Sequence, residues 1–170
     1  LRKALDQVEG MFAFGLWDKK QKKLFLVRDR FGEKPLFFYK HSNFIVFSSE
    51  LKSLSKFPLI NLKISRRSSY YYSVLGYVPA PLSIYENIFK VMPAEVISFR
   101  NKITKKNIYY QIPKPEFNKE LLYEKCKKEL LNTLEESIKK MMIADVEIGC
   151  FLSGGIDSSL VALLMQKNSK

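Results

Sequence analysis

Six small, polar or flexible residues lie close together between two apolar segments near the C-terminal end of the 170-residue chain. The stretch reads CFLSGGIDSSLVALLMQ (residues 150–166), and the six are Ser153, Gly154, Gly155, Asp157, Ser158 and Ser159. A strand that runs through a glycine-rich turn into a helix can bind an anion, because the first N–H groups of the helix lack acceptors within it. Glycine lets the backbone approach a ligand, and serine hydroxyls add donors. The pattern predicts a pocket for phosphate oxygens.

The sequence also excludes one common type of phosphate-binding loop. A Walker A loop needs a lysine after its second glycine, and Ile156 stands there instead, so the loop is not suited to hold a γ-phosphate for transfer. Asp157 would repel phosphates unless a Mg²⁺ lies between them, or unless its carboxylate caps its own helix. Both interpretations stay open, with Mg²⁺ favoured. The alternative without a ligand is a serine-rich connection in which Asp157 or Ser158 is the N-cap.

Strands dominate the part of the chain that precedes this loop. Residues 11–17 and 24–27 predict two strands around a charged turn, each apolar on both faces. A strand of that kind must be covered on both sides, so we expect a sheet between two layers. Residues 65–76 predict a helix that ends at Gly76, and residues 94–110 predict a hairpin with Asn101 and Lys102 in its turn.

The periodicity changes after residue 110. Two prolines in QIPKPEFNKE indicate a linker, and apolar residues then recur every four positions from Leu122 to Ile138. This spacing predicts an amphipathic helix from about Asn118, its N-cap, to Met142. Residues 146–152 predict a buried strand and residues 159–166 a further helix. The change from strands to helix–strand–helix predicts two domains.

Composition narrows the class of protein. The net charge is +12, but the lysines are dispersed along the chain, which favours a solvated surface over a stripe that binds nucleic acid. Cys126 and Cys150 have no neighbouring Cys or His at zinc spacing, and we expect both to be core thiols. No signal peptide and no apolar run of the ~20 residues that span a bilayer is evident, so we expect a cytoplasmic protein. Since the chain starts at Leu1 and ends in a helix-like pattern, we expect it to be cut from a longer protein.

The sequence LSGGIDSS (residues 152–159) resembles the PP-loop of the ATP pyrophosphatases. The resemblance implies that the loop holds the β,γ-pyrophosphate of ATP while a substrate oxygen attacks the α-phosphate. Binding the leaving group stabilises the charge that grows in the transition state. Members of that superfamily include asparagine, argininosuccinate, GMP and NAD synthetases and tRNA-thiolating enzymes.

The sequence before the loop indicates which of these enzymes the chain resembles. GMFAFGLWD, RDRFGEKPLFFY and FSSELKSL follow one another in the order seen in the class II glutamine amidotransferase domain of glutamine-hydrolysing asparagine synthetases. The likeness covers nearly the whole chain; it departs at MPAE (residues 92–95), where many members have Pro-Gly, and at Tyr110, where Trp is common. It implies an α+β Ntn-hydrolase-like sandwich (αββα, partial) over residues 1–112 and a linker over 113–118. Residues 119–170 would be the start of an α/β adenine-nucleotide α-hydrolase-like PP-loop domain.

The resemblance also assigns roles to single residues. The loop residues named above would bind ATP and pyrophosphate, with the backbone of Leu152 meeting the nucleotide and Asp157 as the candidate for Mg²⁺. Met11 matches a position that lines an ammonia tunnel, although a core methionine is an equal alternative. Arg28, Asp29 and Gly32 would only support the fold, and His41 would be a surface residue. The family's N-terminal cysteine nucleophile is absent, so no catalytic residue is assigned and the stretch alone should be inactive.

The implied reaction is the ATP-dependent synthesis of asparagine from aspartate, with ammonia supplied by glutamine. We expect ATP and Mg²⁺ as cofactors, small-molecule substrates, no nucleic acid and no membrane, and we leave a homodimer open. One alternative is an amidotransferase that acts on a sugar carboxylate, or a β-lactam-forming relative. Another is a tRNA-modifying PP-loop enzyme that uses the +12 charge. A remnant that no longer binds ATP is the non-catalytic alternative.

Overall fold

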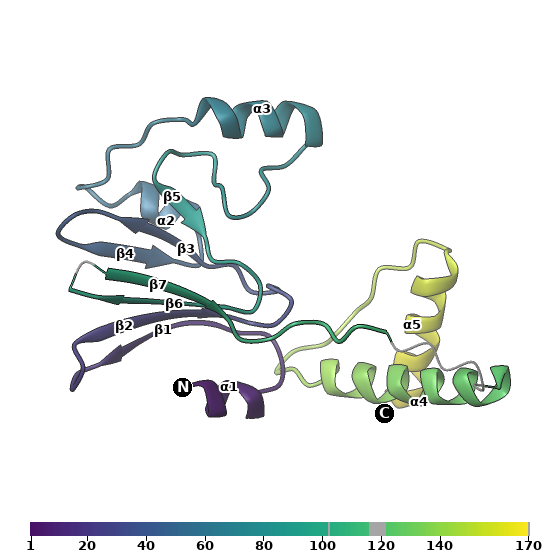
Figure 1. The fold of residues 1–170 in the computed structure, drawn as a ribbon. Coiled ribbons are helices and arrows are strands. Elements are labelled where there is room, and N and C mark those ends of the chain that lie inside the picture. Colours follow the sequence, from purple (N-terminus) through teal and green to yellow (C-terminus); the bar gives the residue numbers. More distant parts are fainter. Residues whose placement is uncertain (102, 116–121, 170) are drawn as a thin grey trace. The chain divides into compact units, whose positions relative to one another are not determined.

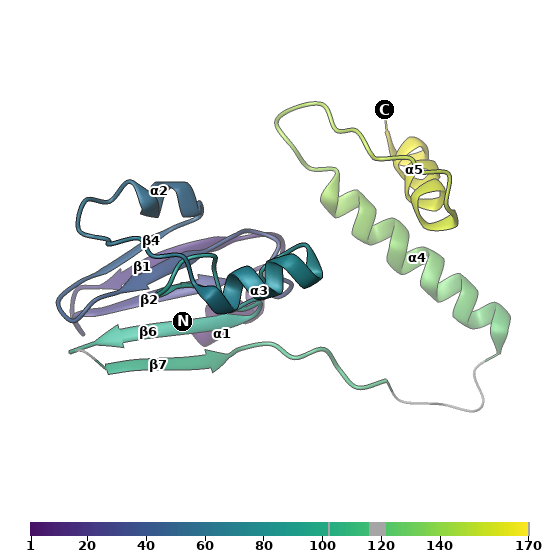
Figure 2. The same ribbon diagram turned by 90° about the horizontal axis from the view of Figure 1, so that it is seen from above.

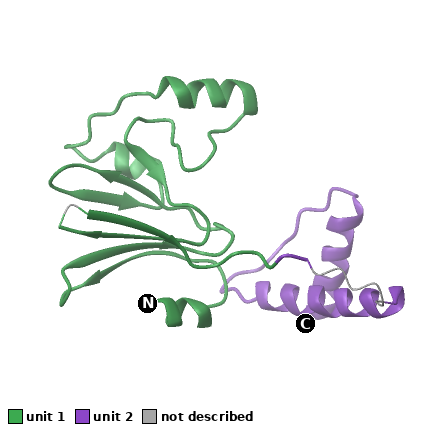
Figure 3. Ribbon diagram, viewed as in Figure 1, with its two compact units in different colours: residues 1–113 green, residues 114–170 purple. Residues whose placement is uncertain are grey.

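The computed structural model describes residues 1–101, 103–115 and 122–169. The chain divides into two compact units, residues 1–113 and residues 114–170 (Figure 3). No helix in the described ranges combines the length and the apolar character needed to cross a membrane.

Two antiparallel sheets form the first unit (Figure 1). One sheet has the strand order β1-β2-β6-β7 and the other has the order β4-β3-β5. The strands are β1 (Ala13–Asp18), β2 (Lys23–Arg28), β3 (Phe37–Lys40), β4 (Ile45–Ser48), β5 (Ile88–Lys90), β6 (Glu95–Arg100) and β7 (Ile103–Ile108). The helices of this unit are α1 (Arg2–Gln7), α2 (Leu51–Ser55) and α3 (Arg66–Leu75).

Side chains that alternate along the strands build three apolar layers. Leu26 and Ile97 of the first sheet pack against Phe38 of the second, between the two sheets. On the outer face of the first sheet, Val27 packs with Leu5 of α1. On the outer face of the second sheet, Leu54 of α2 is buried with its neighbours. The order helix, sheet, sheet, helix confirms for β2 the expectation that strands apolar on both faces are covered on both sides (Figure 1). The expectation fails for the end of β1, where Leu16 and Trp17 are exposed.

Hydrogen bonds from two neighbouring charged residues to backbone groups fix the loop after β2. The Arg28 guanidinium donates hydrogen bonds to the carbonyl oxygens of Gly32, Lys34 (2.8 Å) and Val91 (2.7 Å), which joins the loop to the segment after β5. The carboxylate of Asp29 accepts from backbone N–H groups of the same loop. These contacts are structural, as expected for the RDRFGEKP stretch.

Several local predictions are confirmed and two elements were missed. The expected helix over residues 65–76 is α3, which ends at Gly76 with φ +75°, and the expected hairpin over residues 94–110 is β6–β7. Lys102, expected in its turn, lies outside the described residues. The sequence gives no strong signal for α1, which has no capping side chain, or for β5, which is three residues long and pairs with β3.

The second unit contains α4 (Tyr123–Met141) and α5 (Ile156–Asn168) in its described part (Figure 2). Asn118, the expected N-cap of the first of these helices, lies outside the described residues. Glu135 of α4 accepts a hydrogen bond from Lys167 of α5 at 2.9 Å and pairs with Lys139 at 3.0 Å. These two partners lower the pKa of Glu135 to about 2. The ion pair therefore joins α5 to α4.

The expected buried strand over residues 146–152 is wrong. The structure has no strand there, and the side chain of Phe151 is 100% exposed. A strand needs a neighbour that pairs with its backbone, and none of the described residues of the second unit forms a strand. Cys150 is exposed for the same reason, which corrects its interpretation as a core thiol, whereas Cys126 on α4 is partly buried.

Ser68 on α3 offers a test of the packing in the first unit. Its side chain is fully buried, and its Oγ has no hydrogen-bond partner among the described residues. Replacing Ser68 with alanine removes an unsatisfied hydroxyl and raises helix propensity, so we expect the free energy of unfolding to rise by about 1 kcal/mol. Urea unfolding followed by circular dichroism measures this change.

A neighbouring serine is the matched control. Ser65 is the N-cap of α3, and its side chain accepts a hydrogen bond from the N–H of Ser68 at 3.2 Å. Ser65→Ala should therefore lower the free energy of unfolding by about 1 kcal/mol. A loss of stability in Ser68→Ala would mean that its hydroxyl has a partner in solution.

Candidate functional site

The loop from Leu152 to α5 has the backbone geometry of an anion site. Gly154 has φ +83°, a left-handed conformation that favours glycine, and a Cβ placed on it would meet nothing within 4 Å. Gly155 is the N-cap of α5 and provides no side chain that caps the helix. The first N–H groups of α5 therefore point out of a 13-residue helix beside an open turn.

Two serine hydroxyls of the loop lie close together beside the N-terminus of α5. Ser153 Oγ and Ser158 Oγ lie 3.0 Å apart, although their residues are five positions apart in the chain. Ser158 Oγ donates to the carbonyl oxygen of Gly155 at 3.1 Å, so Ser153 is the donor in the bond between the two serines. Ser153 is exposed, so its hydroxyl can rotate away from Ser158 and donate to an incoming anion.

Asp157 and Ser159 lie within α5. Asp157 is the second residue of the helix, is exposed and does not cap it. The alternative in which Asp157 or Ser158 is the N-cap is wrong, because Gly155 occupies that position. The N–H of Ser159 donates to the Gly155 carbonyl oxygen at 3.0 Å, which closes the first turn of the helix. The side chain of Leu152 is exposed before the turn.

The residues present fit a magnesium–phosphate group. The open left-handed turn, the helix N-terminus and the Ser153 hydroxyl are donors for phosphate oxygens, and the Asp157 carboxylate is an oxygen ligand of the kind that Mg²⁺ prefers. Within the described ranges, no three His, Cys, Asp or Glu side chains gather to hold a metal ion. A Mg²⁺ at Asp157 would thus be shared with phosphate and water oxygens, as is usual for this ion.

Met11 belongs to the first unit. It precedes β1 and its side chain is 51% exposed, whereas the next residue, Phe12, packs on the outer face of the first sheet. The structure therefore does not bury Met11 as a core methionine. Its place in an ammonia tunnel stays a prediction.

A second group of residues was missed from the sequence. His41 is exposed, as expected, but it also lines a cavity together with Trp17 and Arg100. These residues lie in or beside three hairpin turns that are distant in the sequence: Trp17 is near the end of β1, His41 follows β3 and Arg100 ends β6. Each turn on its own resembles an ordinary polar loop. Only the pairing of the strands brings them together, so no local signal could have identified the group.

Comparison with known protein families agrees with the architecture. Residues 2–110 match the family model of the glutamine amidotransferase domain, and residues 129–170 match that of asparagine synthase. The first match covers more than half of the chain, which therefore belongs to the glutamine amidotransferase family. The two matches in this order on one chain confirm its resemblance to the glutamine-hydrolysing asparagine synthetases.

The alignments with curated relatives cover almost the whole chain. "Putative asparagine synthetase (glutamine-hydrolyzing) 2" of Methanocaldococcus jannaschii is 38% identical over 95% of this chain and 32% of its own length. Asparagine synthetase (glutamine-hydrolyzing) 1 of Bacillus subtilis is 34% identical over 93% of this chain and 25% of its own. Amidase chry2 of Gibberella zeae is 30% identical over 93% and 23%. The chain thus spans about a third or less of the length of these relatives.

Proposed function

We propose that the chain is part of an enzyme that makes asparagine from aspartate with glutamine as the nitrogen donor. In this reaction ATP adenylates the side-chain carboxylate of aspartate and pyrophosphate leaves. Ammonia released from glutamine then displaces AMP, which gives asparagine, glutamate, AMP and pyrophosphate. The substrates are ATP, aspartate and glutamine, the cation is Mg²⁺, and the location is the cytoplasm.

The observation that carries this proposal is the geometry of residues 153–158. A left-handed glycine, an uncapped helix N-terminus and two hydroxyls 3.0 Å apart all lie on the exposed side of one turn. The backbone N–H groups at the start of α5 are already oriented before ATP binds, so they can stabilise the negative charge on departing pyrophosphate, and the Ser153 hydroxyl can rotate from Ser158 to join them. Ser153, Gly154, Gly155, Ser158 and Ser159 would bind its oxygens, next to the backbone of Leu152. Asp157 would hold the Mg²⁺ that neutralises them.

The layers of the first unit support the finer fold assignment. The order helix, sheet, sheet, helix is that of an Ntn-hydrolase-like sandwich. We assign residues 1–112 to the glutaminase domain, 113–118 to the linker and 119–170 to the start of the PP-loop domain. The family resemblance implies an N-terminal cysteine as the glutaminase nucleophile, with its own amine as base, and neither Cys126 nor Cys150 has that role.

A double-labelling experiment tests the reaction with the complete enzyme. Aspartate labelled with ¹³C, glutamine labelled with ¹⁵N in its amide, and Mg·ATP are incubated together, and the products are analysed by mass spectrometry. We expect asparagine that carries both labels, with one AMP and one pyrophosphate for each asparagine. Omitting ATP should abolish the product. Turnover of glutamine and ATP without labelled asparagine would contradict the proposal.

The same experiment distinguishes the second candidate function. A relative named as an amidase matches 93% of this chain, so relatives of this chain are not confined to proteins named as asparagine synthetases, and an amidotransferase with another acceptor is the second candidate. In that case glutamate and AMP would form only when another carboxylate, such as a sugar acid, replaces aspartate in the assay.

A further inference from the structure

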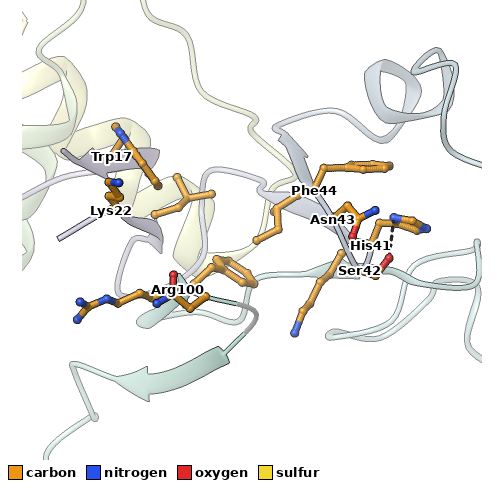
Figure 4. Close-up of a pocket in the computed structure, with 12 residues that line it drawn as sticks. Trp17, Lys22, His41, Ser42, Asn43, Phe44 and Arg100 are labelled. Carbon is orange, nitrogen blue, oxygen red and sulfur yellow. Dashed lines mark hydrogen bonds between the residues drawn. The ribbon is translucent and has the colours of Figure 1, made fainter. Parts of the chain in front are cut away.

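A cavity of about 730 Å³ lies in the first unit, where three hairpin turns meet (Figure 4). In this view Trp17 and Lys22, from the β1–β2 hairpin, stand opposite Asn43 and Phe44, from the β3–β4 turn, while Arg100 of β6 lies at the lower edge. The volume is in the range that encloses a small organic molecule. The cavity lies at the end of β1 opposite to Met11 and belongs to a different unit from the phosphate loop.

The floor of this cavity is apolar. It is formed by Leu24, Phe44, Ile45 and Phe99, all of them buried or partly buried. At the mouth, the indole of Trp17 is 54% exposed, so a large flat surface is available to a ligand. A flat ring that stacks on this indole would gain contact area and aromatic stacking.

The charge around the mouth is positive. Lys22, Lys40 and Arg100 line the cavity, and none of the described residues that line it is Asp or Glu. The carboxylate of the neighbouring Asp18 accepts a hydrogen bond from the N–H of Gln21 within the β1–β2 turn. Arg100 also lines an adjacent hollow of about 310 Å³ with Lys23 and Lys105. A cationic ligand would therefore find no counter-charge here, whereas an anion would find several.

Polar groups between the floor and the cations complete the site. The His41 ring stacks on Phe44, with 4.7 Å between the ring centroids, and Ser42 Oγ lies 3.3 Å from His41 Nδ1. The Nζ of Lys40 donates to Thr104 Oγ1 at 2.6 Å, which holds this cation at the β7 side. The side-chain amides of Asn43 and Asn101 offer both donors and acceptors at the rim.

We propose that this cavity binds a small aromatic phosphate of the nucleoside monophosphate class. The ring lies against Trp17 over the apolar floor, and the phosphate lies among Lys22, Lys40 and Arg100. Asn43 and Asn101 supply hydrogen bonds to polar groups of the ring or the sugar. This site is separate from the ATP loop and from the reaction proposed above.

Trp17 makes the proposal directly measurable, because it is the only tryptophan of the chain. The chain is titrated with AMP and with GMP while its tryptophan fluorescence is recorded. We expect a saturable change with either nucleotide, and a much weaker one with adenosine or inorganic phosphate, each of which supplies half of the ligand. Saturating pyrophosphate, which occupies the loop of residues 153–158, should leave the change intact.

Two lysines of one turn give a matched pair of variants. Lys22 lines the cavity, whereas the exposed Lys19 of the same turn does not. Lys22→Gln should weaken AMP binding about threefold to tenfold, and Lys19→Gln should leave it unchanged. Equal weakening by both variants, binding of adenosine as tight as that of AMP, or no saturable signal at millimolar nucleotide would each overturn the proposal.

Discussion

Replacing Asp29 with alanine is expected to lower the free energy of unfolding by about 3 kcal/mol or more. The side chain is 1% exposed, and its carboxylate accepts the backbone N–H groups of Phe31 (3.1 Å), Glu33 (2.9 Å) and Lys34 (2.9 Å). Alanine would leave these three part-buried donors without their acceptor in the folded loop. Urea unfolding followed by the fluorescence of Trp17, which lies in the same unit, measures the loss.

Two further variants show whether the hydrogen bonds are responsible. Asp29→Asn keeps one acceptor oxygen but places an NH₂ group against a backbone donor, so we expect about half of the loss. Asp18 is the matched control, since among the described residues its carboxylate accepts a single N–H, that of Gln21, in a surface turn. Asp18→Ala should lower the free energy of unfolding by about 1 kcal/mol or less. Similar losses in Asp18→Ala and Asp29→Ala would show that the hydrogen bonds of the buried Asp29 carboxylate contribute no more to stability than the one in the surface turn.

The pH dependence of stability provides an independent test of Asp29. Burial alone would raise the pKa of this carboxyl, but the N–H groups of Lys34, Glu33, Phe31 and Gly32 outweigh burial, so its pKa in the folded state is lowered. The unfolded chain therefore binds a proton first as the solution is acidified. The contribution of Asp29 is complete above its ordinary pKa, near 4, and is lost as the pH falls toward the folded-state value. We expect Asp29→Asn to lose less stability than the wild type between about pH 5 and pH 3.

The strand-rich half of the fold was predictable from sequence because its signals are local. Apolar residues on both faces of the strands over residues 11–17 and 24–27 indicate a sheet with a layer packed on each face. The β6–β7 hairpin follows from its turn residues. The order of the strands was not predictable. The pairing of β2 with β6, and of β3 with β5, joins segments that are distant in the sequence, and no periodicity specifies such partners.

The apolar run of residues 146–152 shows a limit of the same reasoning. Its composition predicts a buried strand, yet burial depends on a sheet to pair with, and the described residues of the second unit contain none. The loop that follows is different, since its conformation depends on Gly154, Gly155 and the start of α5, all within a few residues. A candidate phosphate site could therefore be identified from the sequence, whereas the cavity at the hairpin turns could not, because three separate turns build it.

Replacing Gly154 with alanine is expected to reduce the exchange of labelled pyrophosphate into ATP about 100-fold in the complete enzyme. A Cβ on Gly154 meets nothing within 4 Å, so the effect cannot come from a clash. It comes from φ +83°, which alanine adopts only at a cost of about 1–2 kcal/mol. The turn relaxes toward negative φ, and the N–H groups and the Ser153 hydroxyl no longer converge on one anion. The assay contains aspartate and Mg·ATP, and thermal unfolding is measured in parallel.

Gly76 at the end of α3 is the matched control, because the same substitution there has the same backbone penalty without a role in the loop. Its φ is +75°, and a Cβ on it also meets nothing within 4 Å. Gly76→Ala should lower stability about as much as Gly154→Ala while pyrophosphate exchange stays within about twofold of the wild type. If both variants lost exchange equally, a general loss of stability would explain the result. If neither lost it, the turn at Gly154 would have no part in holding pyrophosphate, and the ATP-dependent step would have to be assigned to other residues.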